Sequence, residues 1–127
     1  MASSQAQVAQ DAEFTRRLAK IRARFISKLD DTIRSIDDAS KSMSCDLKDS
    51  AAVVARAYRQ IHDVCGIAST VGLIAAGLSA RALDSLLVDP FRAQRGLTDD
   101  ELTQLKDGLT ALRSAALADI SHETVQE

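Results

Sequence analysis

The sequence predicts an all-α protein, an antiparallel up-down-up-down four-helix bundle. Apolar residues recur every three or four positions in four separate segments, which is the period of an α-helix. The chain has one Tyr, three Phe and no Trp, and only one Pro and five Gly, a composition poor in both strand formers and turn residues. Its 127 residues fit a single domain. We expect this domain over residues 11–120, between a flexible N-terminus at residues 1–10 and a flexible tail at residues 121–127.

The first predicted helix begins at about residue 11. Basic and acidic residues separate its apolar positions, which indicates one buried and one solvated face. The apolar positions are Phe14, Leu18, Ile21, Phe25, Leu29, Ile33 and Ile36. The helix ends where residues 37–50 supply loop and capping residues.

The second helix begins after Asp49 or Ser50, either of which can cap its first amides. Its apolar positions are Val54, Ala57, Ile61, Val64 and Ala68. We expect a break at residues 70–72. A third helix then covers residues 73–88 and stops before Pro90, because proline restricts the residue that precedes it.

Residues 89–97 are expected to form a loop before the fourth helix. Thr98 and Glu101 have the spacing of a capping box, which predicts the start of that helix. Its apolar positions are Leu102, Leu105, Leu109, Leu112 and Ala116. Four amphipathic helices with short connections bury their apolar faces most simply as a bundle.

Composition excludes several classes of function. The 16 basic and 18 acidic residues are nearly balanced, which argues against a bulk nucleic-acid binder. Cys45 and Cys65 form no disulfide framework and have no metal-ligand spacing. The uncharged residues 64–80 include Gly and Ser and fit a turn between buried helices better than a membrane span. With no signal peptide at the N-terminus, we expect a cytoplasmic protein that binds no metal, cofactor, nucleic acid or membrane.

The chain has two histidines, and His62 is the candidate functional residue. His122 lies in the predicted tail and is expected to be a solvated surface residue. His62 follows the core residue Ile61 and therefore projects about 100° away from the centre of the apolar face. Its neighbours on the same helix face are Tyr58, Arg59, Cys65, Gly66 and Ser69. A glycine inside a helix costs about 1 kcal/mol relative to alanine, so we expect Gly66 to keep space open for a bulky partner of His62.

Residues 61–73 resemble the signature of histidine-containing phosphotransfer (Hpt) domains. That signature reads His, any residue, an aliphatic, usually Lys, Gly, any residue, Ala or Ser, and further on Gly and often Leu. The matching residues are His62, Val64, Gly66, Ala68, Gly72 and Leu73. The departure is Cys65, which stands where the family usually has lysine. The predicted bundle extends the resemblance over roughly residues 11–118.

The resemblance implies a phosphoryl carrier of a two-component phosphorelay, not a kinase. His62 would accept the phosphoryl group from the aspartate of one receiver domain and pass it to the aspartate of another. The partners implied are the receiver domains of a hybrid histidine kinase or a response regulator, which also supply Mg²⁺, so the chain needs no cofactor of its own. The expected receiver interface comprises Tyr58, Arg59, Ser69 and Lys28.

The missing lysine leaves open which cation assists the transfer, because a thiol carries no positive charge. Arg59 lies one turn before His62. A reversal of the chain near Val71 would bring Arg81 close to His62, and a reversal near Cys45 would bring Lys28 alongside.

Two alternatives to a phosphoryl carrier remain. The chain could be an Hpt-like docking module that binds receivers or a kinase without carrying phosphate, or an unrelated helical scaffold. A conventional enzyme is not indicated, since we find no catalytic triad, phosphate-binding glycine loop or acid–base pair of carboxylates.

Overall fold

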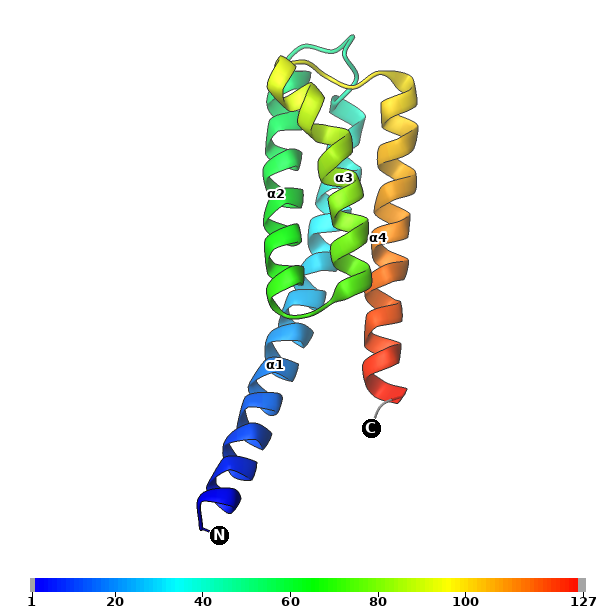
Figure 1. Ribbon diagram of the computed structural model, residues 1–127. Helices are drawn as coiled ribbons and strands as arrows, with labels where there is room; N and C mark the ends of the chain where they lie inside the picture. Colours follow the sequence, from blue (N-terminus) through cyan, green and yellow to red (C-terminus); the bar gives the residue numbers. More distant parts are fainter. Residues whose placement is uncertain (1, 126–127) are drawn as a thin grey trace.

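The structure, a computed structural model, describes the backbone of residues 2–125 and the side chains of residues 4–121. Four α-helices occupy this range, α1 (Ala2–Ala39), α2 (Ser50–Thr70), α3 (Ile74–Ala93) and α4 (Asp99–Val125), and a short 3-10 helix, η1 (Ser40–Ser42), follows α1. Successive helices run in opposite directions, and the connections lie at alternate ends of the bundle (Figure 1). The predicted all-α four-helix bundle is confirmed.

One apolar core joins all four helices. Every predicted apolar position of α2 is buried, and the apolar positions of α4 are buried from Leu105 onward, with Leu102 half-buried. Helices α2 and α3 pack most extensively against each other. The 3–4 spacing therefore located the core faces of these helices correctly.

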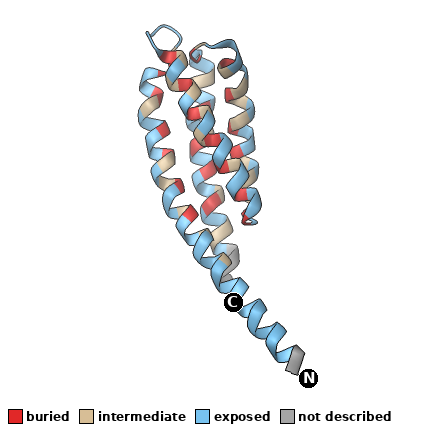
Figure 2. Ribbon diagram, turned by 90° about the vertical axis from the view of Figure 1, so that its left-hand side faces the viewer, coloured by how far each residue is buried: buried red, intermediate tan, exposed pale blue. Residues whose placement is uncertain are grey.

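Helix α1 is longer than the sequence pattern indicated, because it begins at Ala2 and not near residue 11. Its N-terminal part projects beyond the bundle and is exposed along its length (Figure 2). No other helix of the described residues covers this part, so Phe14 and Ile21 are 67% and 50% exposed, whereas Phe25 and Leu29 are buried. Helix α4 likewise continues to Val125, past residue 120, and residues 126 and 127 lie outside the described range. The flexibility expected for both ends stays a prediction.

The predicted cap of α2 is wrong. Asp49 precedes the helix, but its backbone is left-handed, with φ of 65°, and neither it nor Ser50 caps the first amides through its side chain. A capping side chain requires an extended backbone at this position. The carbonyl of Asp49 instead accepts hydrogen bonds from the N–H groups of Ala52 and Val53, at 3.1 and 3.3 Å.

The predicted break between α2 and α3 is confirmed, and residues of α1 and α4 hold it in place. Gly72 has φ of 76°, a left-handed conformation that glycine adopts without strain. Arg22 of α1 donates through Nε to the carbonyl of Val71 at 2.6 Å. Asp119 of α4 accepts hydrogen bonds from the first amides of α3, those of Ala75 and Ala76, at 3.2 and 2.9 Å. The end of the α2–α3 hairpin is therefore fixed from both sides.

Helix α3 does not stop before Pro90 as expected, but continues to Ala93. Proline inside a helix removes one N–H and crowds the carbonyl four residues earlier. Pro90 lies in the last turn and is fully buried, so its burial offsets this penalty. Gln94 then ends the helix in a left-handed conformation, with φ of 53°. Phe91 is consequently a residue of α3 and not of a loop.

The start of α4 is as predicted. The Thr98 N–H donates to Glu101 Oε1 at 2.9 Å, and the Glu101 N–H donates to Thr98 Oγ1 at 3.2 Å, which is a complete capping box. Arg95 of the preceding loop pairs with both carboxylate oxygens of Glu101. This guanidinium lowers the pKa of Glu101 to about 2.

Candidate functional site

His62 lies in the middle of α2, with its ring outside the core. The neighbouring Ile61 is fully buried, whereas the His62 side chain is 67% exposed. This arrangement follows from the 100° step between successive helix residues. The imidazole is therefore accessible to a macromolecular partner.

Asp84 of α3 forms a hydrogen bond with this imidazole, and the sequence analysis did not identify it. His62 Nδ1 lies 2.9 Å from Asp84 Oδ2, and the carboxylate side chain is only 23% exposed. The two residues face each other because α2 and α3 pack antiparallel after the turn at residues 71–73. The expected reversal near Val71 brings Arg81 close to His62, whereas the residue that contacts the imidazole is Asp84, about one helical turn further along α3.

This hydrogen bond determines which ring nitrogen is free. A carboxylate accepts a hydrogen bond, so Nδ1 carries the proton in the neutral ring and Nε2 keeps its lone pair. Nε2 is the ring nitrogen that does not contact Asp84, in a side chain that is largely exposed. The arrangement presents a nucleophilic nitrogen to solvent.

An aromatic stack borders His62 toward the C-terminal end of α3. The Tyr58 ring lies 5.8 Å from the imidazole, between ring centroids, and stacks on Phe91 at 4.4 Å. The Arg59 guanidinium carbon lies 5.8 Å from the centroid of Phe91. Arg59, a predicted cation for the transfer, thus lies over Phe91, and it forms no hydrogen bond with the imidazole among the described residues.

Gly66 and Cys65 lie one turn after His62 and have different surroundings. A Cβ added to Gly66 would meet no atom within 4 Å, so close helix packing does not explain this glycine. The Cys65 side chain is half-buried. Burial raises the pKa of its thiol, the Asp84 carboxylate raises it further, and Arg81 opposes both effects. Cys65 is therefore a neutral group beside His62.

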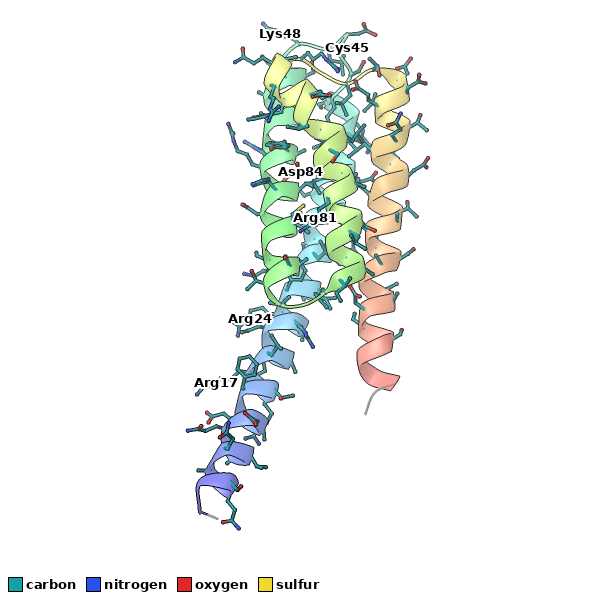
Figure 3. All side chains as sticks on the ribbon, viewed as in Figure 1. Arg17, Arg24, Cys45, Lys48, Arg81 and Asp84 are labelled. Carbon is teal, nitrogen blue, oxygen red and sulfur yellow. The ribbon has the colours of Figure 1, made fainter. Side chains whose placement is uncertain are left out.

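Arg81 of α3 lies on the same side of the hairpin as His62. It is exposed and lines an open groove between α2 and α3, together with Ser69. Figure 3 shows Arg81 and Asp84 on the part of α3 that borders α2. The structure thus brings Asp84 against His62, and it places Cys65 close enough to Asp84 and Arg81 for both charges to act on its thiol.

An exposed apolar patch continues from this groove toward the turn between α2 and α3. Ile67, Ile74 and Leu78 are 46%, 74% and 62% exposed. Ile74 and Leu78 also line the groove, where Gly72 and Gly77 leave room between the helices. Large apolar side chains grouped on a surface mark a site of protein contact.

Lys28 is not part of this cluster. It is an exposed residue of α1, and α1 borders the side of α2 that carries Val53, Arg56 and Gln60, away from His62. Its place in a receiver interface stays a prediction. The side chain of His122 lies outside the described residues, so the expected exposure of that histidine stays a prediction as well.

The described residues contain neither a membrane-spanning helix nor a cluster of metal-binding side chains. No helix among them is long and apolar enough to cross a membrane. The described residues also include no group of three or more His, Cys, Asp or Glu side chains that could hold a metal ion.

The fold and the site define a class of protein, an all-α bundle that presents one accessible imidazole in the middle of a helix. Comparison with known families agrees. A family model described as "Hpt domain" matches residues 20–115, which include both His62 and Asp84. The chain therefore belongs to the Hpt domain family, whose members carry phosphoryl groups on histidine in two-component phosphorelays. Neither the curated proteins nor the solved structures include a match to this chain.

Proposed function

We propose that this protein relays a phosphoryl group between receiver-domain aspartates through a phosphohistidine at His62. The observation that supports this proposal most directly is the hydrogen bond of Nδ1 to Asp84 in a largely exposed side chain, which leaves the lone pair of Nε2 available in the neutral ring. Family membership supports a phosphocarrier of two-component signalling in general. The relay between two receivers is the more specific step of the proposal.

In the forward step, the lone pair of His62 Nε2 attacks the phosphorus of an aspartyl phosphate. The P–N bond forms as the P–O bond to the receiver carboxylate breaks, and the electron pair of that bond stays on the carboxylate oxygen. The proton on Nδ1 remains in place, and Asp84 balances the positive charge that develops on the ring. The reverse step returns the electron pair to Nε2, so neither direction requires a proton transfer.

The receiver docks over the exposed face formed by α2 and α3. Tyr58 and Ser69 flank His62 on this face, and Ile67, Ile74 and Leu78 provide an apolar surface beside it. The receiver supplies Mg²⁺ and its own carboxylates. Such a relay operates in the cytoplasm, where we place this protein.

The test is incubation with a purified receiver domain that has been phosphorylated beforehand. We expect acid-labile, alkali-stable phosphate on the protein, and loss of this label in His62→Gln. His122→Gln is the matched control and keeps the label. Because His62 lies outside the core, the circular dichroism of His62→Gln stays that of the native bundle. Labelling of His62→Gln at the native rate would contradict the proposal.

A docking module that binds receivers without accepting phosphate is the second candidate. The neutral Cys65 thiol supports it, since no lysine stands at this position to stabilise a phosphoryl group. This candidate predicts receiver binding, measured by calorimetry, without any labelling of the native protein. Membership of the Hpt family excludes the third alternative, an unrelated scaffold.

A further inference from the structure

A phosphoryl group on His62 would have a negatively charged neighbour. Asp84 contacts the imidazole directly and carries the same sign of charge as the phosphoryl oxygens. Like charges at this separation repel, and a cation close to the oxygens is needed to offset the repulsion. Helix α2 does not supply it, because Cys65 is neutral and Arg59 lies over Phe91.

Arg81 is the cation that α3 offers on the face that carries Asp84, beside the groove between α2 and α3. It precedes Asp84 by three residues, so both side chains project from the same face of α3. Its guanidinium forms no ion pair or hydrogen bond with any of the side chains described for residues 4–121. Arginine has a long side chain and a planar set of donors that matches two phosphoryl oxygens at once.

Resting on the function proposed above, we propose that Arg81 binds the phosphoryl group carried by His62. In this site α3 supplies both charged groups, the Arg81 guanidinium and the Asp84 carboxylate. The phosphoryl oxygens are then held by Arg81 while Nδ1 is held by Asp84. Cys65, which is half-buried and neutral, does not compete with Arg81 for the phosphate.

The proposal is tested with two phosphoryl donors, a phosphorylated receiver domain and potassium phosphoramidate. Phosphoramidate needs no docking surface, because it is a small molecule that releases ammonia as the P–N bond to His62 forms. We expect Arg81→Ala to slow labelling about tenfold with both donors, equivalent to about 1.4 kcal/mol of barrier. Arg81→Lys keeps most of the rate. The matched control is Arg92→Ala, which removes an exposed arginine elsewhere on α3.

A second-site variant separates a phosphate contact from a general effect on the fold. Introducing Cys65→Lys into Arg81→Ala places a cation on α2, one turn from His62, and should restore the rate with phosphoramidate. An independent measurement is the alkylation rate of Cys65 in a Cys45→Ser background. Arg81→Ala should slow it, because the guanidinium favours the thiolate.

The outcomes distinguish this proposal from the function on which it rests. If the native protein accepts no label from either donor, the phosphotransfer function itself is wrong. If the native protein is labelled but Arg81→Ala matches its rate with phosphoramidate, only the assignment of Arg81 is wrong. A defect seen with the receiver alone would make Arg81 a docking residue, which also overturns the proposal.

Discussion

Replacing Gly66 should raise the stability of the protein, and a large side chain at this position should slow phosphotransfer from a receiver. Glycine inside a helix is destabilising by about 0.5–1 kcal/mol relative to alanine, and an added Cβ here meets no other atom. Gly66→Ala should therefore stabilise the protein by that amount. With an unfolding entropy of about 2.1 cal/mol/K per residue, a chain of 127 residues should gain about 2–4 °C in Tm. Thermal unfolding followed by circular dichroism measures this gain.

The functional effect is expected from a larger side chain. Gly66→Leu keeps high helix propensity but fills the open space one turn from His62. We expect it to slow labelling by a phosphorylated receiver at least tenfold, and to leave labelling by phosphoramidate nearly unchanged. Ala52→Leu, at an exposed position of α2 away from His62, is the control. Either a Gly66→Ala protein that is less stable, or a Gly66→Leu protein that accepts phosphate from the receiver normally, would refute this explanation of the glycine.

Two further predictions concern Asp84 and Glu101. A hydrogen bond to a charged group contributes about 1.5–3 kcal/mol, and because the His62 ring is largely exposed we reduce this to about 1 kcal/mol, or about fivefold in tautomer population. Asp84→Ala should shift the His62 tautomer in nitrogen NMR spectra, with His122 unchanged as the internal control, whereas Asp84→Asn should keep the native tautomer. The pKa of Glu101 is lowered to about 2 in the folded state, so its contribution to stability is complete above the unfolded value of 4.5 and is lost as the pH falls toward 2. The urea midpoint of the native protein should therefore fall more between pH 5 and pH 3 than that of Glu101→Gln, and equal losses would contradict the role of the Arg95 ion pair.

The features that the sequence predicted correctly are local in the chain. The burial of Ile61 and the exposure of His62 follow from the 100° step of a helix whose core face is defined by its own spacing. The capping box at Thr98 likewise involves residues only three positions apart. Such features need no knowledge of how helices pack against each other.

The features that were missed depend on the exact register of two helices. The residue opposite His62 is set by the position of the turn, and a shift of a single residue rotates the facing helix by 100°. Asp84 could be identified only once the register of α2 against α3 was known. Gly72 indicates in the sequence where the turn lies. The sequence does not give the backbone conformation of that turn, which sets the register of the two helices.

Two predictions near the end of α3 were wrong for the same reason. They are the end of the helix before Pro90 and the loop over residues 89–97. A proline normally marks the end of a helix, but Pro90 is buried in the last turn of α3, which continues to Ala93. With residues 89–97 treated as a loop, Phe91 could not be placed beside Tyr58. The stacking of Tyr58 and Phe91, and the resulting position of Arg59, were therefore not predictable from α2 alone.

The geometry of the site also depends on residues far from it. The bond between His62 and Asp84 joins α2 to α3 three helical turns away from the connection at residues 71–73. A two-helix hairpin alone would let its helices slide, since apolar contacts are not directional. Here Arg22 of α1 binds the carbonyl of Val71, and Asp119 of α4 binds the first amides of α3. The outer helices α1 and α4 thus fix the register of the hairpin, and this register sets the tautomer and the accessible nitrogen of His62.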